Sequence, residues 1–119
     1  MSVSKHDGGC HCGAVRYSVE IDPMAESIAC NCSICGRTGA YLQFVTPDKF
    51  ALHQGNDSLT DYQFNKHIIH HLFCKTCGIR SFARGRGRDG TEMIAINVRC
   101  LDDVDTNALP TKKYDGKHA

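Results

Sequence analysis

Three cysteines fall within six consecutive residues of this chain, at Cys30, Cys32 and Cys35, and Gly36 follows them directly. A C-x-C spacing that overlaps a C-x-x-C spacing lets three sulfur atoms surround one face of a soft metal ion. Zinc takes four thiolate ligands in a tetrahedral arrangement, so three local cysteines leave one coordination position unassigned. A fourth side chain takes that position in a structural site, and water or substrate takes it in a catalytic site. The function therefore depends on what completes this group of thiols.

The remaining cysteines are also grouped, which favours metal binding over disulfide bonds. The chain has eight cysteines, and they fall into four groups along the sequence: Cys10 with Cys12, the three at Cys30, Cys32 and Cys35, Cys74 with Cys77, and Cys100 alone. Residues 1–9 lack the apolar core of a signal peptide, so we expect a cytoplasmic protein whose thiols stay reduced. The spacing then predicts two zinc ions per chain.

Length and charge indicate a single domain and disfavour nucleic-acid and membrane partners. With 119 residues, the chain suits one zinc-binding domain over 1–119, with residues 1–8 frayed because they are polar. The formal net charge of +1 provides no overall attraction to nucleic acid or to a membrane surface. No apolar run approaches the roughly 20 residues that a membrane helix needs. We expect neither nucleic acid nor a membrane as a partner, and exposed sheet edges in a small β domain favour a homodimer.

Short alternations of apolar and polar residues predict an all-β fold. The clearest one covers residues 15–21, where the apolar side chains occupy every second position. Further strands are expected at 27–29, 40–46, 50–53, 59–64, 68–73, 79–83 and 91–99. Between them we expect a turn or one turn of helix at 36–39, an exposed loop at 84–90 and a short helix at 103–109 before Pro110.

Two distant cysteine pairs predict a closed four-sulfur zinc site. Cys10 and Cys12 lie two residues apart at the start of a strand, so both thiols point to the same side. Cys74 and Cys77 form a C-x-x-C turn that ends in a glycine. A zinc ion held by these four residues would contribute about 10 kcal/mol to folding. The alternative, in which Cys30 and Cys32 join the second pair, leaves Cys10, Cys12 and Cys35 without a role and is less favoured.

The three thiols at 30–35 favour thiol chemistry over hydroxide chemistry. Three thiolates on Zn²⁺ give a net charge of −1, which makes a bound water less acidic than in a histidine site. Exchange of that water for an incoming thiol suits this ligand set better, because zinc keeps the thiol ionised at neutral pH and ready to attack a small carbonyl. A closed structural site remains the alternative, completed by one of Cys100, His11, His67, His70 and His71.

Four segments together resemble a known family: residues 9–17 (GCHCGAVRY), 30–35 (CNCSIC), 73–78 (FCKTCG) and 97–102 (NVRCLD). They are similar to the glutathione-dependent formaldehyde-activating enzymes, a family that also includes centromere protein V. The resemblance implies a β-tent fold, with small antiparallel sheets stapled by a structural zinc on Cys10, Cys12, Cys74 and Cys77. It further implies a labile zinc on Cys30, Cys32 and Cys35 that meets the sulfur of glutathione. The chain is shorter than the family's namesake.

Two functional hypotheses follow from this pattern. The first is a carbon–sulfur lyase that makes or cleaves thiol–aldehyde adducts, with formaldehyde, glutathione and S-hydroxymethylglutathione as the reactants that the family implies. Glutathione carries two carboxylates, for which Arg37 is the best-placed cation, with Arg80 and Arg99 as further candidates. The second is a non-catalytic double-zinc module that binds nucleic acid or a protein partner, for which the arginines of the 84–88 segment are candidates.

Overall fold

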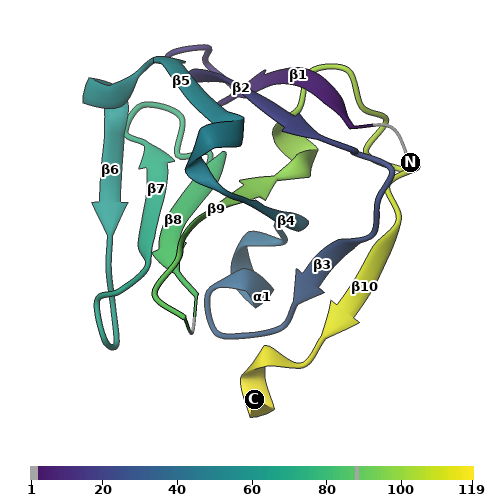
Figure 1. Ribbon diagram of the computed structural model, residues 1–119. Helices are drawn as coiled ribbons and strands as arrows, with labels where there is room; N and C mark the ends of the chain where they lie inside the picture. The colour runs from purple at the N-terminus through teal and green to yellow at the C-terminus, as the bar shows by residue number, and fades with distance from the viewer. Residues whose placement is uncertain (1–2, 88) are drawn as a thin grey trace.

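The computed structural model describes residues 3–87 and 89–119, which form two β-sheets joined by short loops (Figure 1). One sheet has three strands in the order β1-β2-β5, and the other has seven in the order β10-β3-β4-β9-β8-β7-β6. The helix in this described part is α1 (Cys35–Thr38), a single turn, accompanied by short 3₁₀ turns. The predicted all-β fold is confirmed.

The three-stranded sheet consists of β1 (Ser4–Gly9), β2 (Arg16–Ile21) and β5 (Phe50–Gln54). All its pairs are antiparallel, and β1 pairs with β2 along its whole length. The expectation that residues 1–8 are frayed was therefore wrong for residues 4–8, whereas residues 1–2 lie outside the described part. The polar strand β1 is ordered because its hydrogen bonds to β2 are made by backbone groups. Ser18 Oγ of β2 also donates a hydrogen bond of 2.7 Å to the Asp7 side chain.

The seven-stranded sheet contains β3 (Ser27–Cys30), β4 (Leu42–Val45), β6 (Leu59–Tyr62), β7 (His70–Cys74), β8 (Phe82–Arg86), β9 (Glu92–Asn97) and β10 (Thr111–Tyr114). Its strand pairs are antiparallel except for β10 with β3, which run parallel. Figure 1 shows α1 lying between the β3–β10 end of this sheet and the β8–β9 strands. No sequence pattern predicts β10, because its four residues are all exposed and do not alternate.

Two further local predictions were wrong. Residues 84–86 are not loop but the end of β8, where Arg84 pairs with Ile94 and Arg86 with Glu92; Arg88, in the same predicted loop, lies outside the described residues. The strand extends because backbone pairing with β9 requires no apolar side chain. Residues 103–109, which are all described, contain no helix. Asp105 instead accepts a hydrogen bond from the Asn107 amide through its side chain, a local contact that competes with helix formation.

The two sheets enclose a core of aromatic and β-branched residues. The alternation predicted for 15–21 is confirmed, since Val15, Tyr17, Val19 and Ile21 are all buried, as are Ile94, Ile96 and Val98. The ring of Phe82 lies 5.8 Å from that of Tyr17 and 4.7 Å from that of Phe50, which links the two sheets. The described part of the chain contains no helix that is long and apolar enough to cross a membrane.

The Tyr17→Phe substitution should stabilise the protein. The hydroxyl of Tyr17 is buried and has no hydrogen-bond partner among the described residues, so its removal relieves an unpaired polar group. We expect the free energy of unfolding to rise by about 1 kcal/mol, measured by urea denaturation. Tyr114→Phe is the control, because that side chain is half exposed and should have no effect. A loss of stability in Tyr17→Phe would contradict the prediction.

Candidate metal centres

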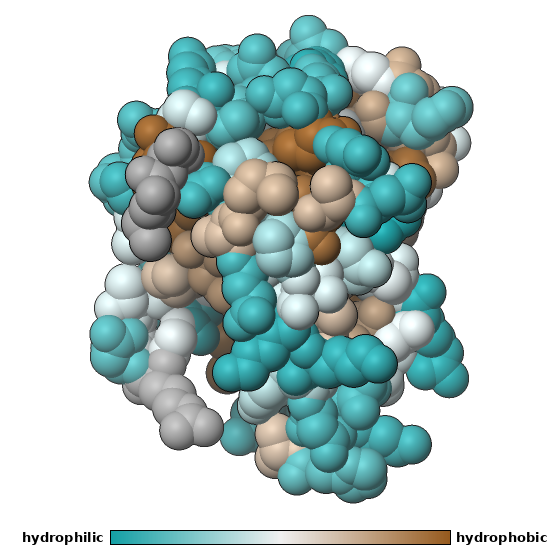
Figure 2. All heavy atoms as spheres, turned by 90° about the vertical axis from the view of Figure 1, so that its right-hand side faces the viewer, coloured by the Kyte–Doolittle hydropathy of each residue, from teal (hydrophilic) through white to brown (hydrophobic). Residues whose placement is uncertain are grey.

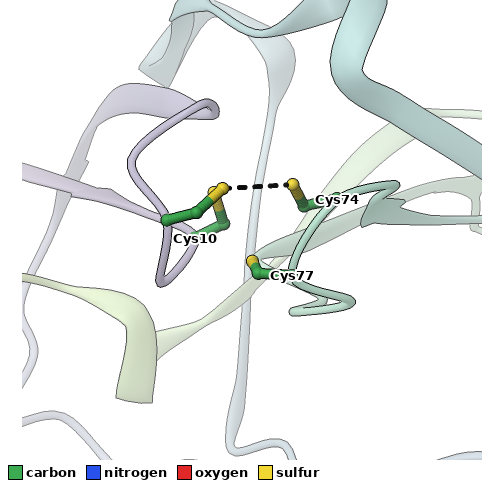
Figure 3. Close-up of side chains that lie close together, drawn as sticks. Cys10, Cys74 and Cys77 are labelled. Atoms are coloured by element: carbon green, nitrogen blue, oxygen red, sulfur yellow. Dashed lines mark hydrogen bonds between the residues drawn. The ribbon is translucent and has the colours of Figure 1, made fainter.

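The first group of thiols joins the two sheets. Cys10 and Cys12 lie in the loop after β1. Cys74 ends β7 and Cys77 lies in the turn that follows, and we call residues 74–78 the knuckle. Figure 3 shows Cys10 facing Cys74 and Cys77 across the space between these two segments. The sulfur atoms of all four cysteines lie within 4.8 Å of one another.

The spacing of these sulfur atoms fits a tetrahedral zinc ion. The sulfur of Cys12 lies 3.6 Å from that of Cys10 and 3.6 Å from that of Cys74. A tetrahedral ion with zinc–sulfur bonds of about 2.3 Å holds neighbouring sulfurs about 3.8 Å apart. The group therefore suits such an ion with little rearrangement. The same geometry argues against the alternative in which Cys30 and Cys32 join the knuckle.

Backbone amides prepare this group for thiolate ligands. The knuckle is closed by hydrogen bonds from the Cys74 amide to the Ile79 carbonyl and from the Gly78 amide to the Cys74 carbonyl. Gly78 has a φ of 79°, which glycine adopts without strain. Hydrogen bonds from the backbone amides of Cys12 and Ile79 lower the pKa of the Cys77 thiol to about 6. Backbone amides of the knuckle likewise lower the pKa of Cys74, so the knuckle favours the ionised form that a metal requires.

The second group of thiols surrounds the start of α1. Cys30 ends β3, Cys35 begins α1, and the sulfur atoms of Cys30, Cys32 and Cys35 lie within 4.8 Å of one another. The loop is compact, because the Gly36 amide bonds the Cys32 carbonyl at 2.8 Å. Burial, followed by the neighbouring thiol of Cys32, raises the pKa of Cys35 to about 11, whereas Arg80 acts in the opposite direction. The guanidinium of Arg80 therefore faces this group from another part of the fold.

Cys100 does not complete the second group. It lies in a 3₁₀ turn (Val98–Cys100), and its thiol donates a hydrogen bond of 3.9 Å to the carbonyl of Arg80. Burial raises the pKa of the Cys100 thiol to about 11, and the nearby sulfurs of Cys10 and Cys77 add to this effect. Cys100 thus lies beside the first group of thiols, outside the set of sulfurs at Cys30, Cys32 and Cys35.

A cavity of about 490 Å³ opens onto the second group of thiols, and we call it the thiol cavity. Its size is typical of sites for small molecules. Much of its wall is apolar and comes from β3, β4, β9 and the β6–β7 connection: Ile28, Leu42, Phe44, Phe64, Ile69, Met93 and Ala95. The basic residues His71, Arg80, Arg84 and Arg86 line it as well, although the guanidinium of Arg84 lies over the rings of Phe50 and Phe82, and none of its described lining residues is acidic. The cavity suits a ligand that is partly apolar and carries negative charge.

The three arginines that the sequence suggested as glutathione partners are not arranged as expected in the structure. Arg37 is exposed and donates a hydrogen bond of 2.7 Å to the Ser33 carbonyl, and it does not line the thiol cavity. Arg99 stacks over the ring of Tyr41 at 4.9 Å. Arg80 does line the cavity, next to Cys35. Proximity in sequence favoured Arg37, but α1 turns that side chain away from the thiols.

Of the four histidines considered as ligands, His71 is the one that lines the thiol cavity. His11 and His67 are exposed, and His70 pairs with Asp61 at 2.7 Å. Burial, followed by the charge of Arg80, lowers the pKa of His71, so its imidazole is neutral at neutral pH. No histidine belongs to either group of thiols in the described part of the chain.

Comparison with known proteins agrees with this arrangement. Residues 5–115 match the sequence model of a family described as "Glutathione-dependent formaldehyde-activating enzyme". The chain belongs to this family. It is also similar to the crystal structure of a Rhodobacter sphaeroides protein, with 34% sequence identity and a TM-score of 0.77 over 89% of this chain and 99% of that one. Family membership supports a glutathione-dependent, formaldehyde-activating function in general, and the two groups of cysteines are able to bind metal.

In this family member the last described segment holds the second group of thiols in place. The Asn31 amide bonds the Tyr114 carbonyl, the Asn31 side chain bonds Asp115, and the Lys117 amide bonds the Asn31 side-chain oxygen. The backbone of Gly116 lies so close to Cys30 that an added Cβ would come within 2.5 Å of its sulfur. Figure 2, which faces the β3–β10 side, shows mostly hydrophilic residues at the end that carries this segment.

The Cys77→Ser substitution should unfold the protein, because the first group of thiols joins the two sheets. A structural zinc contributes about 10 kcal/mol, which is comparable to the whole stability of a small domain. We expect the cooperative thermal transition to be lost, as measured by circular dichroism. Cys100→Ser is the matched control and should keep the fold and both metals. A normal transition in Cys77→Ser would contradict the structural role.

The Gly116→Ala substitution should weaken metal binding at the second group of thiols without unfolding the protein. The added methyl would overlap the Cys30 sulfur and displace it from its two partners. We expect a loss of about 10- to 100-fold in affinity for the second zinc, as is typical when the support of a ligand is altered. Competition with a chromogenic chelator measures this loss. Lys117→Ala is the control, and equal affinity in both variants would contradict the prediction.

Proposed function

We propose that the protein is a zinc-dependent carbon–sulfur lyase that makes and cleaves adducts between a thiol and a small aldehyde. The observation that supports this most is the thiol cavity, which opens onto three sulfurs that neither Cys100 nor a histidine completes. A site with three protein ligands and an adjoining cavity has the form of a catalytic zinc site. Family membership indicates glutathione and formaldehyde as the reactants, with S-hydroxymethylglutathione as the adduct.

In this proposal Cys30, Cys32 and Cys35 hold a labile zinc, whereas Cys10, Cys12, Cys74 and Cys77 hold a structural one. When bound, the labile zinc keeps an incoming thiol in its ionised, nucleophilic form at neutral pH. The role of the three cysteines is to fix the position of this thiol at the end of the thiol cavity. The closed structural site contributes no reactivity, because all four of its positions are taken by side chains.

The walls of the thiol cavity determine what reaches the thiol. Its apolar side chains lower the local polarity around the reacting carbon, which strengthens charge interactions inside. Arg86 of β8 is the proposed partner of a glutathione carboxylate, in place of Arg37, because the guanidinium of Arg84 lies over the rings of Phe50 and Phe82. Arg86 is exposed, which places it on the solvent side of the cavity where a long, charged ligand enters.

The alternative function, a non-catalytic double-zinc module, makes a different prediction for the second metal. A closed module requires four protein ligands at both zinc ions, whereas the enzyme requires three sulfurs and one oxygen or nitrogen at the second. The arginines that suggested nucleic-acid binding include Arg84 and Arg86, which are paired strand residues of β8 rather than a free loop. No described feature favours the module over the enzyme.

The Cys35→Ser substitution should abolish adduct formation while the fold persists. Removal of one of three ligands should lower the metal content from two zinc ions to one, and it should reduce the exchange between formaldehyde, glutathione and their adduct to the uncatalysed rate. Nuclear magnetic resonance exchange spectroscopy measures that rate, and X-ray absorption measures the number of sulfurs per zinc. The control is Ser33→Ala, in the same loop. Four sulfurs on both metals, or full activity in Cys35→Ser, would contradict the proposal.

A further inference from the structure

His71 and Arg80 line the thiol cavity, and both carry buried polar atoms that have no hydrogen-bond partner among the described residues. His71 is 5% exposed, and its Nδ1 has no hydrogen-bond partner among the described residues. The Nε and one terminal nitrogen (Nη1) of Arg80 are buried without a partner as well. Both residues line the cavity together with Cys30, Cys32 and Cys35. Because buried polar groups are nearly always hydrogen-bonded, a small shift of either side chain toward the cavity would let these atoms bond a ligand that carries its own polar atoms.

The knuckle positions both residues. His71 lies in β7 three residues before Cys74, and Arg80 follows Cys77 by three residues. His71 pairs with Ala83 of β8, and its ring stacks on that of Phe64 at 5.2 Å. The Arg80 carbonyl accepts a hydrogen bond of 3.2 Å from the Asn97 side chain. The ring of His71 is therefore held in place, and the backbone of Arg80 is anchored next to the knuckle.

The position of these groups fits an atom bonded close to the reacting sulfur. Arg80 lines the cavity together with Cys30, Cys32 and Cys35, and its guanidinium lies near the thiol of Cys35. The oxygen of a thiol–aldehyde adduct is separated from the sulfur by a single carbon. The carboxylates of glutathione, in contrast, lie at the ends of the tripeptide, many bonds from its sulfur. The aldehyde-derived oxygen is the ligand atom that reaches this place.

We propose that Arg80 and His71 form the binding site for the aldehyde oxygen, an inference that rests on the proposed function. When the thiolate attacks the carbonyl carbon, a sulfur electron pair forms the carbon–sulfur bond and the C=O π pair moves to the oxygen. N–H groups of Arg80 and His71 then donate to the anionic oxygen, which takes a proton from solvent water to become the hydroxyl group of the adduct. The thiol has already released its own proton to solvent, so atoms and charges balance. Cleavage follows the same steps in reverse.

The first test compares two thiols that differ in one oxygen. Binding of 2-mercaptoethanol and of ethanethiol is measured on the cobalt-substituted protein from the absorbance of the cobalt–thiolate bond, with no turnover involved. We expect the wild-type protein to bind the hydroxyl-bearing thiol at least about tenfold more tightly, since its oxygen reaches the two donors. We expect Arg80→Ala and His71→Phe to lose this preference. Equal affinities in the wild-type protein would overturn the inference, whatever the variants do.

The second test separates the oxygen site from a merely structural role. We expect Arg80→Ala to lower kcat for adduct formation by about 10²- to 10³-fold with little change in KM for glutathione. Added guanidinium ion at millimolar concentration should restore part of kcat in Arg80→Ala, which it would not do for a general loss of packing. Arg99→Ala is the matched control, since its side chain stacks on Tyr41 outside the cavity.

The outcomes distinguish this inference from the proposed function. If the wild-type protein does not catalyse adduct formation, the proposed function fails. If the wild-type protein is active but Arg80→Ala stays within about threefold of its kcat, the function stands and the oxygen site is wrong. A fall in kcat without rescue by guanidinium would also overturn the oxygen site and leave Arg80 with a packing role.

Discussion

The four sulfurs of Cys10, Cys12, Cys74 and Cys77 are the link on which the rest of the molecule depends. They connect the loop after β1, in the three-stranded sheet, with the knuckle after β7, in the seven-stranded sheet. A chain of 119 residues buries a modest core, so a metal ion held by these four sulfurs would carry a large share of the folding free energy. The same knuckle positions His71 on one side and Arg80 on the other. A structural site thus determines the shape of the cavity at the second group of thiols.

The thiol cavity brings three thiols and basic side chains together without any carboxylate among its described lining residues, an arrangement that a metal ion and a ligand would complete. Three thiols converge at one end, and Arg80, from the segment between the knuckle and β8, lines the same cavity. The described lining residues include no carboxylate, so negative charge comes from the thiolates and from whatever enters. An apolar wall strengthens these interactions by excluding water. This combination supports chemistry in which sulfur is the nucleophile and an oxygen gains negative charge.

The sequence predicted the elements that depend on local patterns. Apolar alternation located β2 and β9, and cysteine spacing grouped the ligands as the structure does. The sequence-based predictions failed where pairing with a distant strand determines the structure. β10 forms because it pairs with β3, and residues 84–86 extend β8 because they pair with β9. Arg80 and His71 enter the thiol cavity through the geometry of the knuckle, which no spacing reveals. Arg37 lies near the thiols in sequence, but the single turn of α1 turns it outward.

The support of Asn31 by residues 114–117 has a consequence for the order of folding. The three thiols at 30–35 are close in sequence, yet their loop is held by a segment more than 80 residues further along the chain. Contacts of such large separation form slowly, because the intervening chain must first be ordered. The first group of thiols orders most of that chain when it binds its metal. We therefore expect zinc to load sequentially, with the ion between the sheets incorporated before the one at the thiol cavity.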